Sequence, residues 1–206
     1  MALTTLLFFA ITELTLSLSP GPAVFLVVSQ GIKSGFKSSL RGTLGVMTGE
    51  LIFFSLSAAG LSAVITTSQV LFSAIKWLGA AYLVYLGIKM VVASFQKLET
   101  TQPRVPVVQF YRQGLLTQLA NPKAILFFTA LLPQFIDPSL PATQQFVLLG
   151  VVSMIVQSST LIVYGWLAEK GGRLLRESPL TRWLDRVAGG FLVAAGVKLA
   201  LTQQTD

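Results

Sequence analysis

Six apolar stretches follow one another along the chain, and each approaches the length of about 20 residues that a helix needs to cross a bilayer. Only 11% of the residues are charged, whereas a soluble domain carries about 25%. The chain is therefore expected to be an all-α, polytopic membrane protein with six transmembrane helices. The sixth stretch is short and begins among charged residues, so five spans remain an alternative. The stretches cover residues 3–28, 42–65, 70–93, 114–136, 146–168 and 187–201.

The basic residues predict how the chain is oriented. Twelve of the fifteen Lys and Arg residues lie in or beside three connections: between stretches one and two, three and four, and five and six. With six spans these connections share one side, which the positive-inside rule makes the cytoplasm, so both termini are expected outside. The net charge of +7 thus indicates topology, and no nucleic-acid partner is expected. No basic residue precedes Lys33, so we interpret the first stretch as a retained span and not as a signal peptide.

The chain has no Cys and no His, which excludes thiol redox relays and imidazole or thiolate metal sites. A membrane-embedded acyl or phosphoryl transferase would need a nucleophile with a base, or a cluster of metal ligands. The sequence offers neither pattern, so we expect no enzyme, no metal and no cofactor. Three classes of membrane protein are to be separated: a transporter, a membrane-embedded enzyme and a non-transporting membrane partner. A flux assay would separate them.

The two halves of the chain resemble each other. Residues 78–90 (LGAAYLVYLGIKM) match residues 187–199 (VAGGFLVAAGVKL) at an offset of 109. Residues 19–26 (SPGPAVFL) align with 120–127 (ANPKAILF) at an offset of 101. Each half holds three spans, so the second half would enter the membrane inverted, as in many secondary transporters. We expect one transporter domain over 1–206, with repeat one at 1–94, a cytoplasmic linker at 95–113 and repeat two at 114–206.

Both repeats carry a helix breaker at the corresponding place. Proline lacks a backbone N–H and disfavours the helical ladder, so the first span is expected to break around Ser19–Pro22. The fourth is expected to break at Asn121 and Pro122. Two breaks related by a repeat indicate a binding site, although proline kinks that only shape helix packing are the simpler alternative.

Polar side chains gather at a similar depth of the predicted spans. Glu50, Lys123 and Gln157 each lie roughly half-way through a hydrocarbon core about 30 Å thick. Glu50 is a candidate proton carrier, or it forms a purely structural ion pair with Lys123. Lys123 either lines the cavity or extends towards the cytoplasmic interface. Glu13 is either a second proton site or a residue near the outer interface, and Gln157 is expected to join helices.

These motifs resemble the LysE/RhtB family of bacterial amino-acid exporters. The resemblance rests on residues 19–50 (SPGPAVFLVVSQGIKSGFKSSLRGTLGVMTGE), 76–90 (KWLGAAYLVYLGIKM) and 114–135 (GLLTQLANPKAILFFTALLPQF), in this order. It implies amino-acid export across the bacterial inner membrane, driven by the proton gradient. The family's Pro-Gly-Pro falls on Pro20, Gly21 and Pro22, its Asn-Pro-Lys on Asn121, Pro122 and Lys123, and its second-span acid on Glu50.

An amino acid is a zwitterion, so its site needs partners for a carboxylate and for an ammonium. The sequence predicts the carboxylate at N–H groups near Gly21 and Ala23 or near Lys123, and the ammonium at carbonyls near Ser19 and Asn121. Few charged side chains remain for the substrate's own side chain. We therefore expect a small neutral substrate such as threonine, homoserine or leucine; another small solute or a cation is the alternative. The other expected partners are protons and the lipid bilayer, and a homodimer is left open. The candidate substrate residues are Ser19, Pro20, Gly21, Pro22, Ala23, Asn121, Pro122 and Lys123, and the candidate proton carriers are Glu50 and Glu13.

Overall fold

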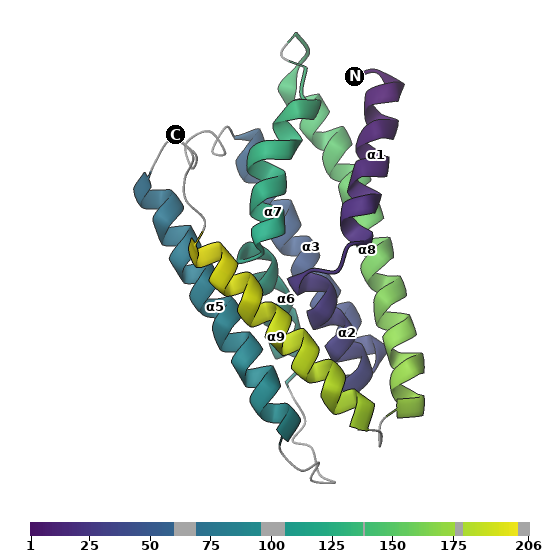
Figure 1. The fold of residues 1–206 in the computed structure, drawn as a ribbon. Coiled ribbons are helices and arrows are strands. Elements are labelled where there is room, and N and C mark those ends of the chain that lie inside the picture. The colour runs from purple at the N-terminus through teal and green to yellow at the C-terminus, as the bar shows by residue number, and fades with distance from the viewer. Residues whose placement is uncertain (60–68, 96–105, 138, 176–178, 202–206) are drawn as a thin grey trace.

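A computed structural model describes residues 1–59, 69–95, 106–137, 139–175 and 179–201, which form eight α-helices (Figure 1). After α7 the chain continues as a π-helical turn over Phe127–Leu131 and a 3-10 turn over Leu132–Phe135. The helices are α1 (Leu3–Leu18), α2 (Pro22–Ser34), α3 (Phe36–Ala58), α5 (Gln69–Phe95), α6 (Val107–Leu119), α7 (Pro122–Leu126), α8 (Ala142–Leu175) and α9 (Pro179–Leu201).

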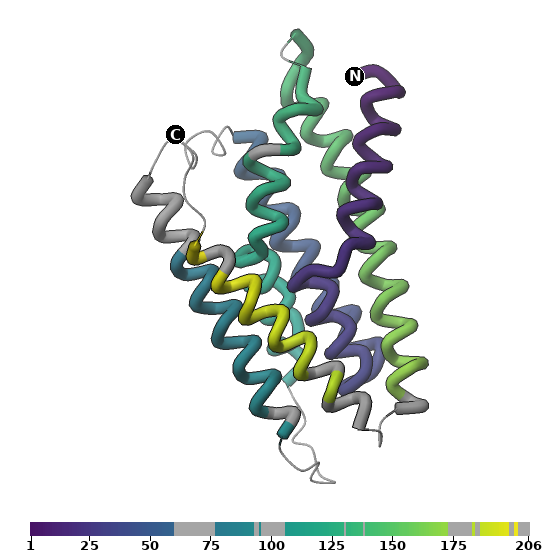
Figure 2. Tube along the Cα trace, viewed as in Figure 1, coloured from purple at the N-terminus to yellow at the C-terminus, as the bar shows by residue number. Residues whose placement is uncertain are grey.

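Both predicted helix breaks are present. Helices α1 and α2 meet at an angle of 54°, and α6 meets the segment Pro122–Phe135 at 44°. The first break appears as an extended piece of tube between the two purple helices in Figure 2. In each case the second helix begins with a proline, Pro22 or Pro122, whose missing N–H costs nothing at the first helical position. The prolines thus both end one half-helix and start the next.

The described helices match an integral membrane protein. Helix α8 is long and apolar enough to span a bilayer over Ala142–Gly172, and each bent pair passes the same test as one unit. Shorter apolar helices cover Trp77–Val92 and Arg186–Val197. The count of six spans therefore stays a prediction, whereas the all-helical membrane fold with two broken helices is confirmed.

Several helices extend beyond the apolar stretches. Helix α6 begins at Val107, inside the expected linker, because Gln109, Arg112 and Gln113 are compatible with helix in the polar flank before Gly114. Helix α8 likewise continues to Leu175. Parts of the sequence predictions lie outside the described residues: 60–65 of the second stretch, 96–105 of the linker with Lys97 and Arg104, and Arg176.

The helices alternate in direction, and the last helices of the two halves pack tightly. In Figure 1, α1 with α2, α5 and α8 descend, whereas α3, α6 with α7, and α9 ascend. A methyl group added to Gly87 would lie 2.5 Å from the Gly189 carbonyl oxygen, and one on Gly196 would lie 2.8 Å from the Ala80 carbonyl oxygen. At the offset of 109, Gly87 corresponds to Gly196 and Ala80 to Gly189. Helices α5 and α9 therefore make the same contact twice, with their roles exchanged.

Two differently packed regions enclose the centre of the fold. Helices α3 and α6 approach through small residues, since a methyl group on Gly49 would lie 2.9 Å from Gln118 Cβ and one on Gly45 would overlap the Tyr111 carbonyl. The other region is aromatic and contains rings packed at centroid distances of 4.9 to 6.1 Å. This aromatic cluster consists of Phe9, Phe54, Phe127, Phe128 and Phe135.

Candidate functional site

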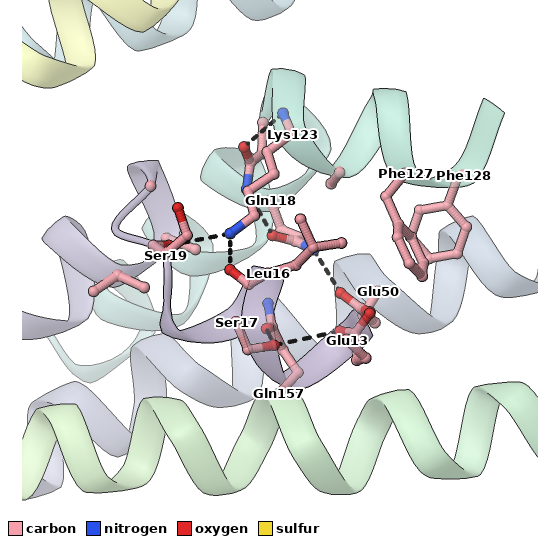
Figure 3. Close-up of a pocket in the computed structure, with 15 residues that line it drawn as sticks. Glu13, Leu16, Ser17, Ser19, Glu50, Gln118, Lys123, Phe127, Phe128 and Gln157 are labelled. Atoms are coloured by element: carbon pink, nitrogen blue, oxygen red, sulfur yellow. Dashed lines mark hydrogen bonds between the residues drawn. The ribbon is translucent and has the colours of Figure 1, made fainter. Parts of the chain in front are cut away.

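A pocket lies where the two broken helices meet, and residues from α1, α2, α3, α6, α7 and α8 contribute to it (Figure 3). One end is apolar because the π-helical turn after α7 directs two phenylalanines to it. Such turns are frequent at functional sites. The lining residues are Glu13, Leu16, Ser17, Ser19, Gly21, Ala23, Val24, Glu50, Gln118, Asn121, Lys123, Ala124, Phe127, Phe128 and Gln157.

The structure brings most of the predicted site residues together. Residues from both breaks and both candidate proton carriers face the same space: Ser19, Gly21, Ala23, Asn121, Lys123, Glu50 and Glu13. The three prolines are not among the lining residues, and they act by interrupting the helices. Glu13 lines the pocket, where its side chain is only 5% exposed, and the position near the outer interface is not the one observed.

At the first break, the N-terminus of α2 is buried without a side-chain cap. Gly21 is the N-cap residue and has no side chain to accept a hydrogen bond from the first turn. Ala23 and Val24, whose N–H groups belong to that turn, are buried and line the pocket. Free N–H groups and the positive end of the helix dipole both favour an anion at this position.

The second break is closed by its own residues. Asn121 Oδ1 accepts a hydrogen bond from the backbone N of Lys123 at 3.1 Å, which caps α7. The other end of the same amide, Nδ2, donates to Gln118 Oε1 at 3.4 Å. Asn121 therefore ties the start of α7 to the end of α6.

Lys123 reaches across the site from the second break to the first. Its Nζ donates to the backbone carbonyls of Leu16 and Ser19 at the C-terminal end of α1, the latter at 3.1 Å. Lys123 thus lines the cavity, and the interfacial position considered from the sequence is not the one observed. A methyl group on Gly21 would lie 3.7 Å from Lys123 Cδ, so the lysine stem passes over the first break.

The two acids lie side by side and have different partners (Figure 3). Glu50 is 3% exposed and accepts hydrogen bonds from Gln118 Nε2 at 2.6 Å and Ser153 Oγ at 2.8 Å. Ser17 Oγ lies 3.4 Å from Glu13 Oε1 and donates to Gln157 Oε1 at 2.7 Å. The hydrogen bonds of Glu50 thus go to neutral side chains, and those of Lys123 Nζ go to carbonyls.

The sequence interpretation missed five residues around these groups: Ser17, Gln118, Ser153, Phe127 and Phe128. Gln118 offered a signal, because an amide inside an apolar stretch is costly to bury without partners. Neither serine stands out in a membrane helix, where hydroxyls commonly bond to their own backbone. The phenylalanines reach the pocket through the π-helical turn, which no local pattern in the sequence predicts.

The chain is similar to several known bacterial proteins. An uncharacterized membrane protein of Vibrio cholerae is 32% identical over 193 residues, which cover 93% of this chain and 94% of that protein. A homoserine/homoserine lactone efflux protein of Salmonella typhi is 31% identical over 196 residues, with coverage of 93% and 94%. A leucine efflux protein of Salmonella choleraesuis is 37% identical over 128 residues, 61% of this chain and 60% of that protein. No solved structure matches significantly.

The family comparison agrees with these relatives and with the fold. The model of the LysE type translocator family matches residues 14–203, which include both helix breaks and every residue of the pocket except Glu13. The family comprises transporters and not enzymes. The chain is a membrane protein that belongs to the LysE type translocator family.

Proposed function

We propose that this translocator exports small neutral amino acids, of the threonine, homoserine or leucine type, by proton antiport across the bacterial inner membrane. The observation that carries the proposal is the pocket at the paired helix breaks, where a free helix N-terminus, helix C-terminal carbonyls and two acids meet. Relatives named as homoserine/homoserine lactone and leucine efflux proteins support the substrate class.

A zwitterion fits the distribution of these groups. The carboxylate would accept hydrogen bonds from the free N–H groups at the start of α2, next to Gly21. The ammonium would donate to the carbonyls of Leu16 and Ser19 at the end of α1. The apolar side chain would extend towards Phe127 and Phe128. The two half-helices of one broken span would then hold both charged groups of the substrate.

Glu50 and Glu13 are the candidate proton carriers. Two buried carboxylates that lie next to each other disfavour the state in which both are charged, so such a pair readily binds one proton. Glu50 is linked through Gln118 to Asn121, and Glu13 precedes the first break on α1. Each acid is thus connected to one of the two breaks, which suits a carrier that couples a proton to a substrate.

The proposed architecture has six spans in two inverted repeats, 1–94 and 114–206, joined by the cytoplasmic linker 95–113, with both termini periplasmic. The alternating helix directions and the exchanged contact between α5 and α9 support it. An inverted repeat offers two related arrangements of one fold, which is the basis of alternating access in many transporters.

The experiment is a flux assay on the purified protein in proteoliposomes with an imposed pH gradient. Labelled leucine, homoserine, threonine and lysine are compared, and empty vesicles serve as control. We expect gradient-driven accumulation of at least one neutral amino acid and little of lysine. Absence of flux for all amino acids, with activity towards another small solute or a cation, would replace the proposal by that alternative.

A further inference from the structure

We propose that the ammonium of Lys123 is an internal substitute for the amino group of the substrate. It binds the carbonyls of Leu16 and Ser19, and an incoming ammonium group takes its place. This inference rests on the proposed function, because it assigns a role to a residue of the same site. Its test is nevertheless independent of transport, as described below.

Lys123 Nζ occupies a position that favours a cation. The carbonyls at a helix C-terminus carry partial negative charge and favour a cation. At the end of α1 the Leu18 carbonyl already accepts a hydrogen bond from Tyr164 Oη at 2.9 Å, and the Ser19 N–H is shared between the carbonyls of Leu16 at 3.1 Å and Thr15 at 3.2 Å. The carbonyls of Leu16 and Ser19 form the part of this helix end that holds an ammonium group.

The side chain of Lys123 crosses from the second break to the first. The Lys123 backbone is fixed by the cap from Asn121, and a methyl group added to Gly21 would lie 3.7 Å from Lys123 Cδ. From there Nζ reaches the end of α1 (Figure 3). The side chain therefore covers both half-helices of the first break. A zwitterion that binds to both of them cannot enter unless this side chain moves.

The Lys123 side chain can move away from α1 without a change at its own backbone. A lysine stem has four flexible carbons, so the ammonium can leave the carbonyls while the backbone stays capped. Glu13 and Glu50 line the same pocket, and a charged carboxylate there attracts the ammonium. A cation that moves towards these acids would favour release of a proton from them to the water of the cavity. Displacement of Lys123 would thus link substrate binding to the proton step.

The test measures equilibrium binding of three probes to purified wild-type protein and Lys123→Met, which removes the ammonium and keeps an unbranched apolar side chain. The probes are 3-methylbutylamine, its trimethylammonium counterpart and 4-methylpentanoate. Removal of an internal competitor that makes charge-assisted hydrogen bonds should tighten binding of the primary amine by about tenfold. The trimethylammonium probe has no N–H to donate, so its affinity should rise much less, by the loss of charge repulsion alone.

Lys123→Arg is the matched control, because it keeps a cation at the same position and should show no such gain. Lys123→Leu replaces the methionine variant if that variant does not remain monodisperse. An equal gain for both amines would reduce the effect to charge and overturn the inference. If Lys123→Met bound the primary amine more weakly and 4-methylpentanoate much more weakly than the wild type does, Lys123 would instead bind the carboxylate. Absence of amino-acid flux in the wild type would contradict only the proposed function. The binding of amines at the carbonyls of Leu16 and Ser19 is measured without transport.

Discussion

The two broken helices occupy corresponding places in the two halves of the chain, yet their ends differ. At the first break, Gly21 leaves the N-terminus of α2 without a side-chain cap, inside a buried pocket. At the second, Asn121 caps the N-terminus of α7 and also contacts Gln118. The bends are similar, at 54° and 44°. The difference between the breaks therefore lies in free hydrogen-bonding groups and not in the size of the bend.

This comparison assigns unequal roles to two related segments. A helix end without a cap has N–H groups left for a ligand, whereas a capped end has already satisfied one of them. The first break is accordingly the candidate substrate-binding site. The second break provides Lys123, which reaches over to the first, and connects through Gln118 to Glu50.

The largest effect is expected from Gly21→Val. A methyl group here would lie 3.7 Å from Lys123 Cδ, which is an ordinary contact. The two further methyl groups of valine would clash with the lysine stem and occupy the space of the substrate. We expect export in proteoliposomes to be abolished while membrane insertion is unchanged. Gly21→Ala is the control and should retain flux, because φ of −145° suits any residue. Full export by the valine variant would exclude the first break as the substrate-binding site.

The next largest effect is expected from Glu50, and comparison with Glu13 shows which of the two acids carries the proton. Glu50→Gln keeps the size of the side chain but removes its charge, so we expect gradient-driven accumulation to be lost. Exchange between equal substrate pools should persist, since exchange needs no net proton movement. Glu13→Gln is the comparison variant. If Glu50→Gln retained wild-type coupling and Glu13→Gln did not, the proton role would move to the acid beside the first break.

A smaller effect is expected when the first break is given a cap like that of the second. Gly21 has an extended backbone compatible with an N-cap residue, so Gly21→Ser can accept a hydrogen bond from the N–H of Ala23 or Val24. The loss of one charge-assisted bond to the substrate should weaken binding by roughly tenfold. Calorimetric titration against Gly21→Ala measures it. Equal affinities of the serine and alanine variants would show that these N–H groups do not bind the substrate.

The smallest effect concerns the cap of the second break. Asn121→Ala removes the acceptor for Lys123 N and should lower stability by about 1 kcal/mol, seen as a lower midpoint of thermal unfolding in detergent. Asn121→Ser keeps a side-chain oxygen that can accept from the same N–H and adds no charge, so it should recover part of the loss. An unchanged midpoint in Asn121→Ala would mean that the two breaks do not differ in the way described.

Local rules predicted the breaks, and tertiary packing decided what they do. Pro20, Pro22 and Pro122 interrupt helices through their own backbone chemistry, which a sequence displays directly. Asn before Pro122 is likewise a readable cap. The sequence does not specify the direction of the Lys123 side chain, because a long flexible side chain takes its position from carbonyls far away in the sequence. The partners of Glu50 depend on how α3, α6 and α8 pack, and no spacing within one helix specifies that.

The central claim is that the first break binds the substrate's carboxylate, and competition in the flux assay tests it most directly. Wild-type protein exports labelled leucine, or whichever amino acid the flux assay identifies, in the presence of unlabelled analogues in large excess. We expect the amino acid itself to compete strongly, whereas its amide and its decarboxylated amine compete far more weakly, because each must displace Lys123 from the carbonyls of α1 without bringing an anion to α2. Inhibition by the simple amine as strong as that by the intact amino acid would show that the carboxylate is not recognised, and would contradict the account.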